Sequence, residues 1–396
     1  MDMAKPKIRF KGYQDDWEQR KLGEVAQITM GQSPDGATYS DEPSDYILVQ
    51  GNADLKDGWV APRIWTTQKT KSCDAGDLIM SVRAPAGAMG KTAYNAVIGR
   101  GVAAIKGNEF LYQTLVKMDA NGYWKKLSAG STFESLNSAN IINAEVMIPS
   151  DAEQEKIGDY FSNLDHLITL HQRKCDEAKK LKKFMLQKMF PQNGSRVPEI
   201  RFDGFTDDWE QRKLSEIAIR VTEKNKNNEF TEPFTNSAEL GIISQKEYFE
   251  REIVNDENLD GYYIVRKDDF VYNPRISGTA PVGPINRNRL ERNGVMSPLY
   301  TVFRVHDIAD LYLEYYFKTT NWHRFMKLNG DSGARFDRFT ISSTQFMEMP
   351  IPYPEVEEQK KIGAYFEHID HLITLHQQKC GDLKNLKKYM LQNMFV

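Results

Sequence analysis

Apolar residues recur at alternating steps of four and three positions in two stretches of the chain, residues 153–190 and 358–395. These steps are typical of helices that pack along one stripe, the seam. Each stretch therefore predicts one long helix, which at ~1.5 Å per residue measures roughly 55 Å. The two seams are Ile157, Phe161, Leu164, Ile168, His171 and Cys175, and then Ile362, Phe366, Ile369, Ile373, His376 and Cys380.

Before each long helix lies a variable segment with shorter apolar periods. Residues 23–148 and 215–350 combine short apolar runs with turn residues, which is typical of a mixed α/β (α+β) fold. We therefore expect two globular α/β domains joined by two long helices. The predicted division is a first domain at 1–150, a first helix at 151–190, a linker at 191–199, a second domain at 200–354 and a second helix at 355–396.

The sequence blocks on either side of a variable segment, together called the frame, occur twice in the chain. IRFKGYQDDWEQRKL from Ile8 returns as IRFDGFTDDWEQRKL from Ile200, a shift of 192 residues, and DHLITLHQ occurs unchanged from Asp165 and from Asp370. The variable segments themselves share little sequence. A repeated frame with different contents predicts one docking geometry applied to two targets. We expect the two helices to pack as an antiparallel coiled coil, because that direction creates a pseudo-two-fold axis.

Composition narrows the class of protein. The chain has 396 residues, of which 40% are hydrophobic and 27% charged, as in ordinary soluble proteins. No run approaches the ~18 apolar residues of a membrane span, no signal peptide is evident, and the three cysteines are too scattered for a disulfide framework. These features predict a cytoplasmic protein. The net charge of −3 argues mildly against a nucleic-acid-binding protein but does not exclude local basic patches.

The repeated blocks resemble those of one family. A lead-in RFxGFxDDWEQRKL, a variable domain and then EQxKIxxYFxxxDHLITLHQxKxxxLKxLKKxMLQxMF form a plan similar to that of the specificity subunit of type I restriction–modification enzymes. The resemblance covers the whole plan of the chain. It implies that each variable domain is a target recognition domain that reads one half of a bipartite double-stranded DNA site. It also implies that the helices set the gap between the halves and hold two modification subunits.

The same resemblance implies that catalysis resides in other chains. S-adenosylmethionine is then a cofactor of the partner methyltransferase subunits, while ATP and Mg²⁺ belong to partner restriction subunits. For this chain we expect no cofactor, no metal, no catalytic residue and no membrane partner.

An arginine follows an apolar run at the same place in both variable segments. Leu78–Met80 leads to Arg83 and Phe270–Tyr272 leads to Arg275, each before a loop of small residues. Such an arginine can approach a phosphate or a guanine edge closely, although it can also pair with a nearby carboxylate. Its presence in both copies favours contact with DNA.

A second correspondence lies near the end of each variable segment, in SAGSTFESLN and DSGARFDRFT. Hydroxyls and guanidinium groups follow one another there, and the resemblance implies that this region lies close to DNA. A cluster of like charges is usually only a solvated face, so the case for DNA depends on location in the variable segments. The candidate DNA-binding residues are Arg63, Lys69, Lys71, Ser81, Arg83, Lys91, Arg100, Ser131, Thr132, Arg275, Ser277, Thr279, Arg287, Arg289, Arg292, Arg335 and Arg338.

Two other classes of function stay open. GAMGKT at Gly87–Thr92 is similar to a phosphate-binding loop, but Pro85 stands where that motif needs its first glycine. A protein-only coiled-coil scaffold is the third hypothesis.

The seam residues His171 and His376 could form a metal pair or a pH sensor, but a polar core residue that fixes helix register is the favoured interpretation.

Overall fold

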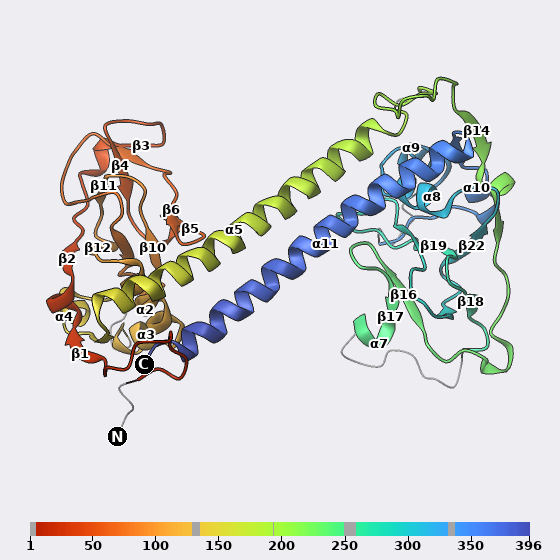
Figure 1. Ribbon diagram of the computed structural model, residues 1–396. Helices are drawn as coiled ribbons and strands as arrows, with labels where there is room; N and C mark the ends of the chain where they lie inside the picture. Colours follow the sequence, from red (N-terminus) through yellow and green to blue (C-terminus); the bar gives the residue numbers. More distant parts are fainter. Residues whose placement is uncertain (1–4, 129–134, 193, 249–258, 332–336) are drawn as a thin grey trace. The chain divides into compact units, whose positions relative to one another are not determined.

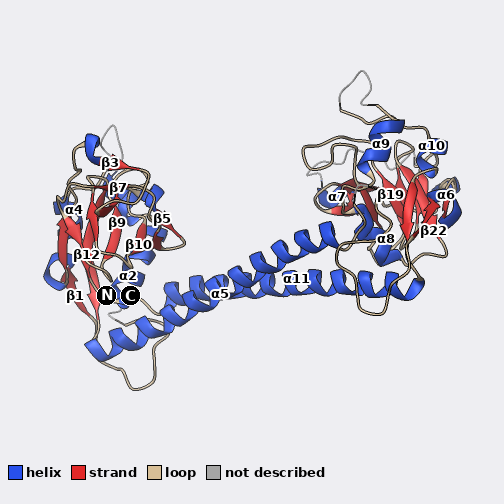
Figure 2. Cartoon of the chain, turned by 90° about the horizontal axis from the view of Figure 1, so that it is seen from above, coloured by secondary structure: helices blue, strands red, loops and turns tan. Residues whose placement is uncertain are grey.

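The computed structural model describes residues 5–128, 135–192, 194–248, 259–331 and 337–396 (Figures 1 and 2). The chain divides into two compact units. Unit 1 contains Met1–Gln172 and Gln377–Val396, and unit 2 contains Arg173–His376. Each unit thus combines one variable segment with part of each long helix, which groups the residues differently from the five-part division predicted from sequence.

Two sheets form the centre of the first variable segment. The larger has the strand order β2-β12-β9-β10-β6-β5, and the smaller has the order β3-β7-β4-β11-β8. The pairs β4–β11 and β6–β10 are parallel, whereas the other neighbours are antiparallel. The strands of the larger sheet are, in order, Gln27–Met30, Val102–Lys106, Leu78–Ser81, Met89–Lys91, Trp59–Val60 and Leu55–Lys56. Those of the smaller are Tyr39–Ser40, Trp65–Thr66, Tyr46–Val49, Ala96–Ile98 and Ser72–Cys73. The helices are α1 (Leu22–Val25), α2 (Glu109–Ala120), α3 (Tyr123–Ser128) and α4 (Ser138–Ile142).

The second variable segment repeats the central part of this plan. Its four-stranded sheet has the order β15-β22-β19-β20, which corresponds to β2-β12-β9-β10. The four strands are Ala218–Arg220, Thr301–Val305, Phe270–Tyr272 and Ile285–Arg287. Two further antiparallel pairs accompany the sheet: β16 (Phe234–Ser237) with β17 (Gly241–Ser244), and β18 (Tyr263–Val265) with β21 (Gly294–Met296). The helices are α6 (Leu214–Ile217), α7 (Gln245–Tyr248), α8 (Asp310–Phe317), α9 (His323–Asn329) and α10 (Ser343–Met347). The mixed α/β class predicted from the apolar pattern is therefore confirmed.

The repeated lead-in closes each variable segment with a short strand pair. In unit 1, β1 (Glu18–Lys21) pairs with β13 (Glu145–Ile148), and in unit 2, β14 (Glu210–Lys213) pairs with β23 (Pro350–Tyr353). An arginine of the lead-in binds the first turns of the long helix that follows. Arg9 Nε lies 2.7 Å from Glu153 Oε1, and Arg201 Nε lies 2.7 Å from Glu358 Oε1. Because the glutamates are almost fully buried, each pair fixes the lead-in to its helix.

The two long helices are α5 (Asp151–Lys188) and α11 (Val356–Asn393). The first half of each helix packs on the short helix of its own variable segment, α5 on α2 and α11 on α8. Gly158 and Gly363 allow this close approach, because a Cβ at either position would meet a neighbour at 3.1 Å (Glu109 Cβ) or 2.7 Å (Leu311 Cβ). The glycines are equivalent in the repeat, so both crossings have the same origin in the sequence.

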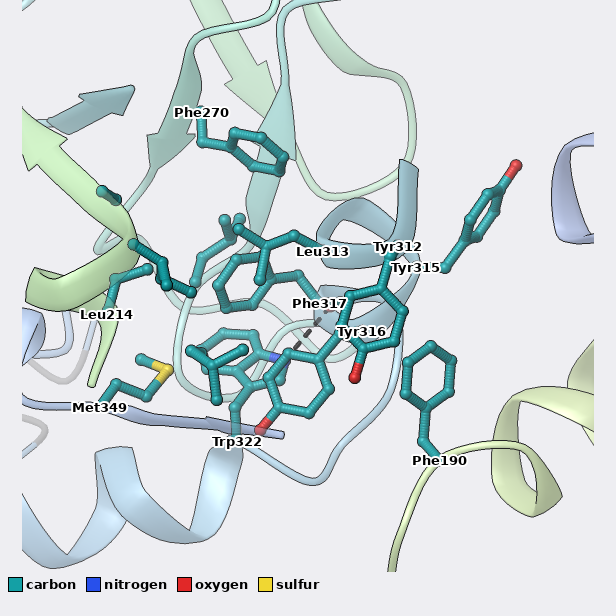
Figure 3. Packing of buried hydrophobic residues seen from close by; sticks show 14 of the residues in the cluster. Phe190, Leu214, Phe270, Tyr312, Leu313, Tyr315, Tyr316, Phe317, Trp322 and Met349 are labelled. Atoms are coloured by element: carbon teal, nitrogen blue, oxygen red, sulfur yellow. Dashed lines mark hydrogen bonds between the residues drawn. The ribbon is translucent and has the colours of Figure 1, made fainter. Parts of the chain in front are cut away.

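The apolar seam continues into the core of each unit. Ile157, Phe161 and Leu164 are buried in a cluster with Trp17 and Phe395. In unit 2, Ile362, Phe366 and Ile369 join the largest core cluster. Figure 3 shows part of that cluster, with Phe190, two residues after the end of α5, beside Tyr312 and Tyr316 of α8. The seam therefore serves the variable segments as well as the helix pair.

Within each unit the parts of the two helices run antiparallel. In unit 1, Lys387 of α11 lies 2.7 Å from Asp165 of α5, and Cys380 Sγ contacts the carbonyl oxygen of Ile168. In unit 2, the repeat-equivalent residues make the same contacts. Lys182 lies 2.6 Å from Asp370, and Cys175 Sγ contacts the carbonyl oxygen of Ile373. The predicted antiparallel direction is thus seen in both units.

The two aspartates also tie the helix pair to the variable segments. Asp165 accepts a hydrogen bond from Gln113 Nε2 of α2 at 3.0 Å, and Asp370 accepts one from the Tyr315 hydroxyl of α8 at 2.9 Å. Each aspartate, the first residue of the repeated octapeptide, therefore joins three helices.

We expect Asp370→Ala to lower the free energy of unfolding of the chain by about 1–2 kcal/mol, because it removes the acceptor for Lys182 and Tyr315 at a partly exposed site. Tyr315→Phe removes one hydrogen bond and should cost about 1 kcal/mol. Denaturant unfolding of the full chain measures both. If Asp370→Ala unfolds at the same midpoint as the unmodified chain, the three-helix junction contributes nothing to stability.

Candidate nucleic-acid interface

Both candidate arginines, Arg83 and Arg275, leave the end of a central, fully buried strand. β9 leads to Arg83 and β19 leads to Arg275, and both strands lie between the same two neighbours in the equivalent sheets. The strands are rigid because every residue in them is buried. The arginine side chains that follow are exposed. Within the described ranges, neither arginine takes part in an ion pair.

The structure brings together the two motifs that were predicted separately. Arg83 forms an isolated antiparallel β-bridge with Ser135, and Arg275 forms one with Arg338. The bridges are secured by main-chain hydrogen bonds, 2.8 Å from Leu136 N to the Val82 oxygen and 2.7 Å from Phe339 N to the Pro274 oxygen. Each bridge therefore places the arginine loop against the end of the second motif. Ser131, Thr132 and Arg335 lie outside the described residues.

Different local bonds hold the two arginines. In unit 1, Ser81 is buried, and its hydroxyl donates to the carbonyl oxygen of Arg83 at 3.0 Å. In unit 2, the Arg275 N–H donates to Asn273 Oδ1 at 2.9 Å, and Asn273 Nδ2 donates to the Asn236 oxygen at 2.8 Å. Ser81 thus has a positioning contact, although it was predicted as a DNA ligand.

Beside Arg275 lies an open groove of about 700 Å³, the reading groove. Three predicted residues, Arg275, Ser277 and Thr279, line it together. The lining also carries the carboxylate of Glu239 and hydrogen-bonding side chains that the sequence analysis missed: Thr235, Asn236, Ser237, Gln245, Asn273 and Tyr300. The lining offers donors, acceptors and a guanidinium group in one concave surface. Such a surface can contact both base edges and phosphates.

Two other predicted cations occupy equivalent places at the opposite end of the central strands. Lys91 pairs in register with Leu78, and Arg287 pairs with Phe270. Lys91 Nζ lies 2.7 Å from Glu109 Oε2, and Arg287 Nε lies 2.8 Å from Glu314 Oε2. Both side chains are largely buried. These ion pairs fix α2 onto the sheet in unit 1 and α8 onto the sheet in unit 2. They therefore favour a structural role for Lys91 and Arg287 over contact with DNA.

The remaining predicted cations differ in their partners. Arg63 pairs with Asp54 at 2.9 Å, Arg289 with Glu314 at 2.8 Å, and Arg292 with Glu232 at 2.7 Å. The hydrogen bonds from Arg292 hold the pKa of the Glu232 carboxyl below its usual value. Arg338 is half-buried beside Asp337, Arg100 contacts the Ser33 hydroxyl, and Lys69 and Lys71 are exposed. DNA contact by these residues remains a prediction.

The segment Gly87–Thr92 does not form a phosphate-binding loop. Such a loop joins a strand to a helix, and its lysine and threonine stand at the start of that helix. Here Met89–Lys91 is the strand β10, and Thr92 is buried with its hydroxyl donating to the Tyr94 oxygen at 2.8 Å. The geometry therefore argues against a nucleotide site.

In the part of the chain that the structure describes, no group of three or more His, Cys, Asp or Glu side chains could hold a metal ion. No helix among the described residues is long and apolar enough to cross a membrane.

Comparison with known proteins identifies relatives of this architecture. The sequence model of the type I restriction modification DNA specificity domain matches the chain twice, at residues 14–180 and 206–385. The type I restriction enzyme MjaVIII specificity subunit of Methanocaldococcus jannaschii is 20% identical over 412 residues, 95% of this chain and 91% of that protein. The MjaIX specificity subunit of the same organism is 26% identical over 178 residues, and this chain spans 39% of its length. The putative type I restriction enzyme MjaX specificity subunit of the same organism is 28% identical over 179 residues, and this chain spans 41% of its length.

Two solved structures share the fold. The crystal structure of a type I restriction–modification S subunit from M. genitalium superposes with a TM-score of 0.64 at 14% identity, over 99% of both chains. A structure described for complex assembly and conformational transition of the type I R–M system gives 0.50 at 18% identity, over 96% of this chain and 97% of that one. At these identities the likeness is one of fold.

Proposed function

The chain belongs to the type I restriction modification DNA specificity family, and from this premise we propose that each variable segment reads one half of a bipartite DNA target. One observation carries the proposal. An exposed arginine leaves the same buried strand in both units and forms the same β-bridge with a second loop, although the surrounding sequences differ. One frame thus presents two different chemical surfaces, as two different half-sites would require.

The reading groove supplies the chemistry for the second half-site. The guanidinium of Arg275 can donate two hydrogen bonds to one guanine edge or to a phosphate. The hydroxyls of Ser277 and Thr279 can donate or accept, so they suit either bases or backbone. Recognition of this kind needs no bond to be broken by this chain, and it agrees with the role of a non-catalytic specificity subunit.

The proposed partners are double-stranded DNA and the subunits of a restriction–modification complex. We assign two modification subunits to the paired helices and restriction subunits to the full complex. S-adenosylmethionine would then act in the modification subunits, and ATP with Mg²⁺ in the restriction subunits. A chain with these partners would work in the cytoplasm, where the DNA is.

Methylation mapping tests the proposal in a host that expresses this chain with its modification subunit. The expected result is methylation at one motif made of two defined halves and a gap of fixed length. Methylation at a single continuous motif would contradict a two-part target. A protein-only scaffold would leave the chain and its partner without any preference for DNA sequence in filter binding.

The helix pair gives a prediction about the gap. Seven residues inserted after Gln172 in α5 and after His376 in α11 preserve the seam and add about 10.5 Å to each helix. We expect the gap between the two half-sites to grow by about three base pairs at ~3.4 Å each, while the bases recognised in both halves stay the same. Methylation mapping measures the gap directly. An unchanged gap would mean that helix length does not set the spacing.

A further inference from the structure

A second groove in unit 2, the lysine groove, is rich in positive charge. It has a volume of about 640 Å³ and lies between the end of α5, the turn after α8 and one face of α11. Five of its lining residues are lysines: Lys179, Lys182, Lys183, Lys188 and Lys318. Only two are carboxylates, Glu199 and Asp370. The groove therefore differs in sign from the chain as a whole, whose net charge is −3.

The carboxylates are already engaged. Asp370 binds Lys182 at 2.6 Å, and Glu199 binds Lys188. In the described part of the chain, Lys179 and Lys183 are exposed and take part in no ion pair. The Lys318 ammonium instead donates to the buried Asn286, and burial lowers the pKa of Lys318. Two lysines of the groove, Lys179 and Lys183, therefore have no carboxylate partner. An anion that enters the groove would displace only water from these side chains.

A chain of polar side chains connects the lysine groove with the reading groove. Lys318 donates a hydrogen bond to Asn286 Oδ1, and Asn286 Nδ2 donates to Asn236 Oδ1 at 2.6 Å. Asn236 lines the reading groove, whereas Lys318 lines the lysine groove. Asn236 and Asn286 are buried, which fixes their amides in place. The two grooves therefore lie only two side chains apart.

We propose that the lysine groove binds backbone phosphates of the DNA strand that runs on from the reading groove. The inference depends on the proposed function, because it takes the reading groove to be the DNA site. Lysines act as flexible point charges and suit phosphates without reading sequence. The lining also includes Thr320, whose exposed hydroxyl can donate to a phosphate oxygen. An acidic protein segment would also suit the charge, but nothing would require that segment to lie beside the reading groove.

The test uses the complex of the full chain with its modification subunit and a duplex that carries the mapped target. The double variant Lys179→Ala/Lys183→Ala should lose two phosphate contacts. The slope of log affinity against log salt should then become less steep by about 1.8, at about 0.9 per phosphate. The methylated motif should stay the same. Lys179→Arg/Lys183→Arg is the matched control, because it keeps both charges and should keep the slope.

Two results would overturn the inference. A slope equal to that of the unmodified complex would show that no phosphate lies at these lysines. Loss of copurification with the modification subunit would instead assign the groove to a protein partner. The proposed function fails in a different way, since an unmodified complex without preference for any bipartite duplex would remove it.

Discussion

Arg275→Ala should weaken recognition of one half of the DNA target and leave recognition of the other half intact. The guanidinium is exposed at the reading groove, outside any ion pair among the described residues, and is positioned by Asn273. Loss of two hydrogen bonds to one base edge costs about 1–3 kcal/mol, which is roughly a 5- to 150-fold loss of affinity for the correct half-site. Methylation mapping should show reduced base specificity in one half of the target only.

Arg266→Ala is the matched control for that experiment. Arg266 lies in the same unit but pairs with Glu223 at 2.7 Å and does not line the reading groove. Its removal should leave the methylated motif unchanged. Arg83→Ala should relax the other half, because Arg83 is the repeat-equivalent residue. If Arg275→Ala and the control give the same motif as the unmodified chain, Arg275 is not a reading residue.

The frame of the fold could be predicted because its key contacts are repeated letter by letter. The interhelical pair Asp165–Lys387 and its equivalent Asp370–Lys182 both lie within the matched blocks. Heptad spacing predicted two helices, and residues 151–188 and 356–393 form them. A repeated pattern predicts a repeated structure, since the same side chains face the same partners in both copies.

Which arginine and lysine side chains form ion pairs could not be predicted, because their carboxylate partners are distant in sequence. Arg287 was grouped with Arg289 and Arg292 as a basic cluster. In the structure Arg287 and Arg289 share Glu314 of α8, while Arg292 binds Glu232. Folding of the sheet against α8 brings Glu314 close to Arg287 and Arg289, whereas Glu232 comes from the segment before β16. Charge along a sequence thus predicts a basic surface poorly when acidic residues come from another element.

The polar lining of the reading groove was missed for a related reason. Asn236 lies in β16 and Asn273 directly follows β19, and the Asn273 amide reaches the main-chain oxygen of Asn236 only when β16 packs beside β19. An asparagine after a short apolar run is ordinarily read as a turn residue. The signal that could have found them is position, since Asn273 lies two residues before Arg275 and at the end of the buried strand.

Residues 1–192 alone should assemble into a homodimer, because the end of α5 repeats the part of α11 that completes unit 1. In unit 1, Lys387 binds Asp165, and Phe395 stacks on Phe110 with ring centroids 5.2 Å apart. The side chains at this site, in the last turns of α11 and directly after it, are Lys387, Met390, Leu391, Met394 and Phe395. The equivalent side chains at the end of α5 and directly after it are Lys182, Met185, Leu186, Met189 and Phe190. The residues are identical at all five positions.

The main chain of α5 offers the same contacts to the lead-in. Ile8 N donates to the Asn393 oxygen at 2.9 Å, and its equivalent Ile200 N donates to the Lys188 oxygen at 3.0 Å. The end of α5 in one copy can therefore cover the lead-in of a second copy. Each large apolar side chain buried in this way contributes about 1.5–3 kcal/mol. We expect sedimentation to give twice the mass of the half-chain.

Charge reversal distinguishes this dimer from unspecific association. Lys182→Asp in the half-chain places two carboxylates together at Asp165, so the dimer should dissociate. Adding Asp165→Lys to the same half-chain restores an ion pair of opposite direction, and the dimer should return. A half-chain that sediments as a folded monomer would show that the end of α5 cannot replace the end of α11. Dimers that persist with Lys182→Asp alone would show that the copies associate through another surface. The swap therefore tests whether the two units are built from one interchangeable set of helix contacts.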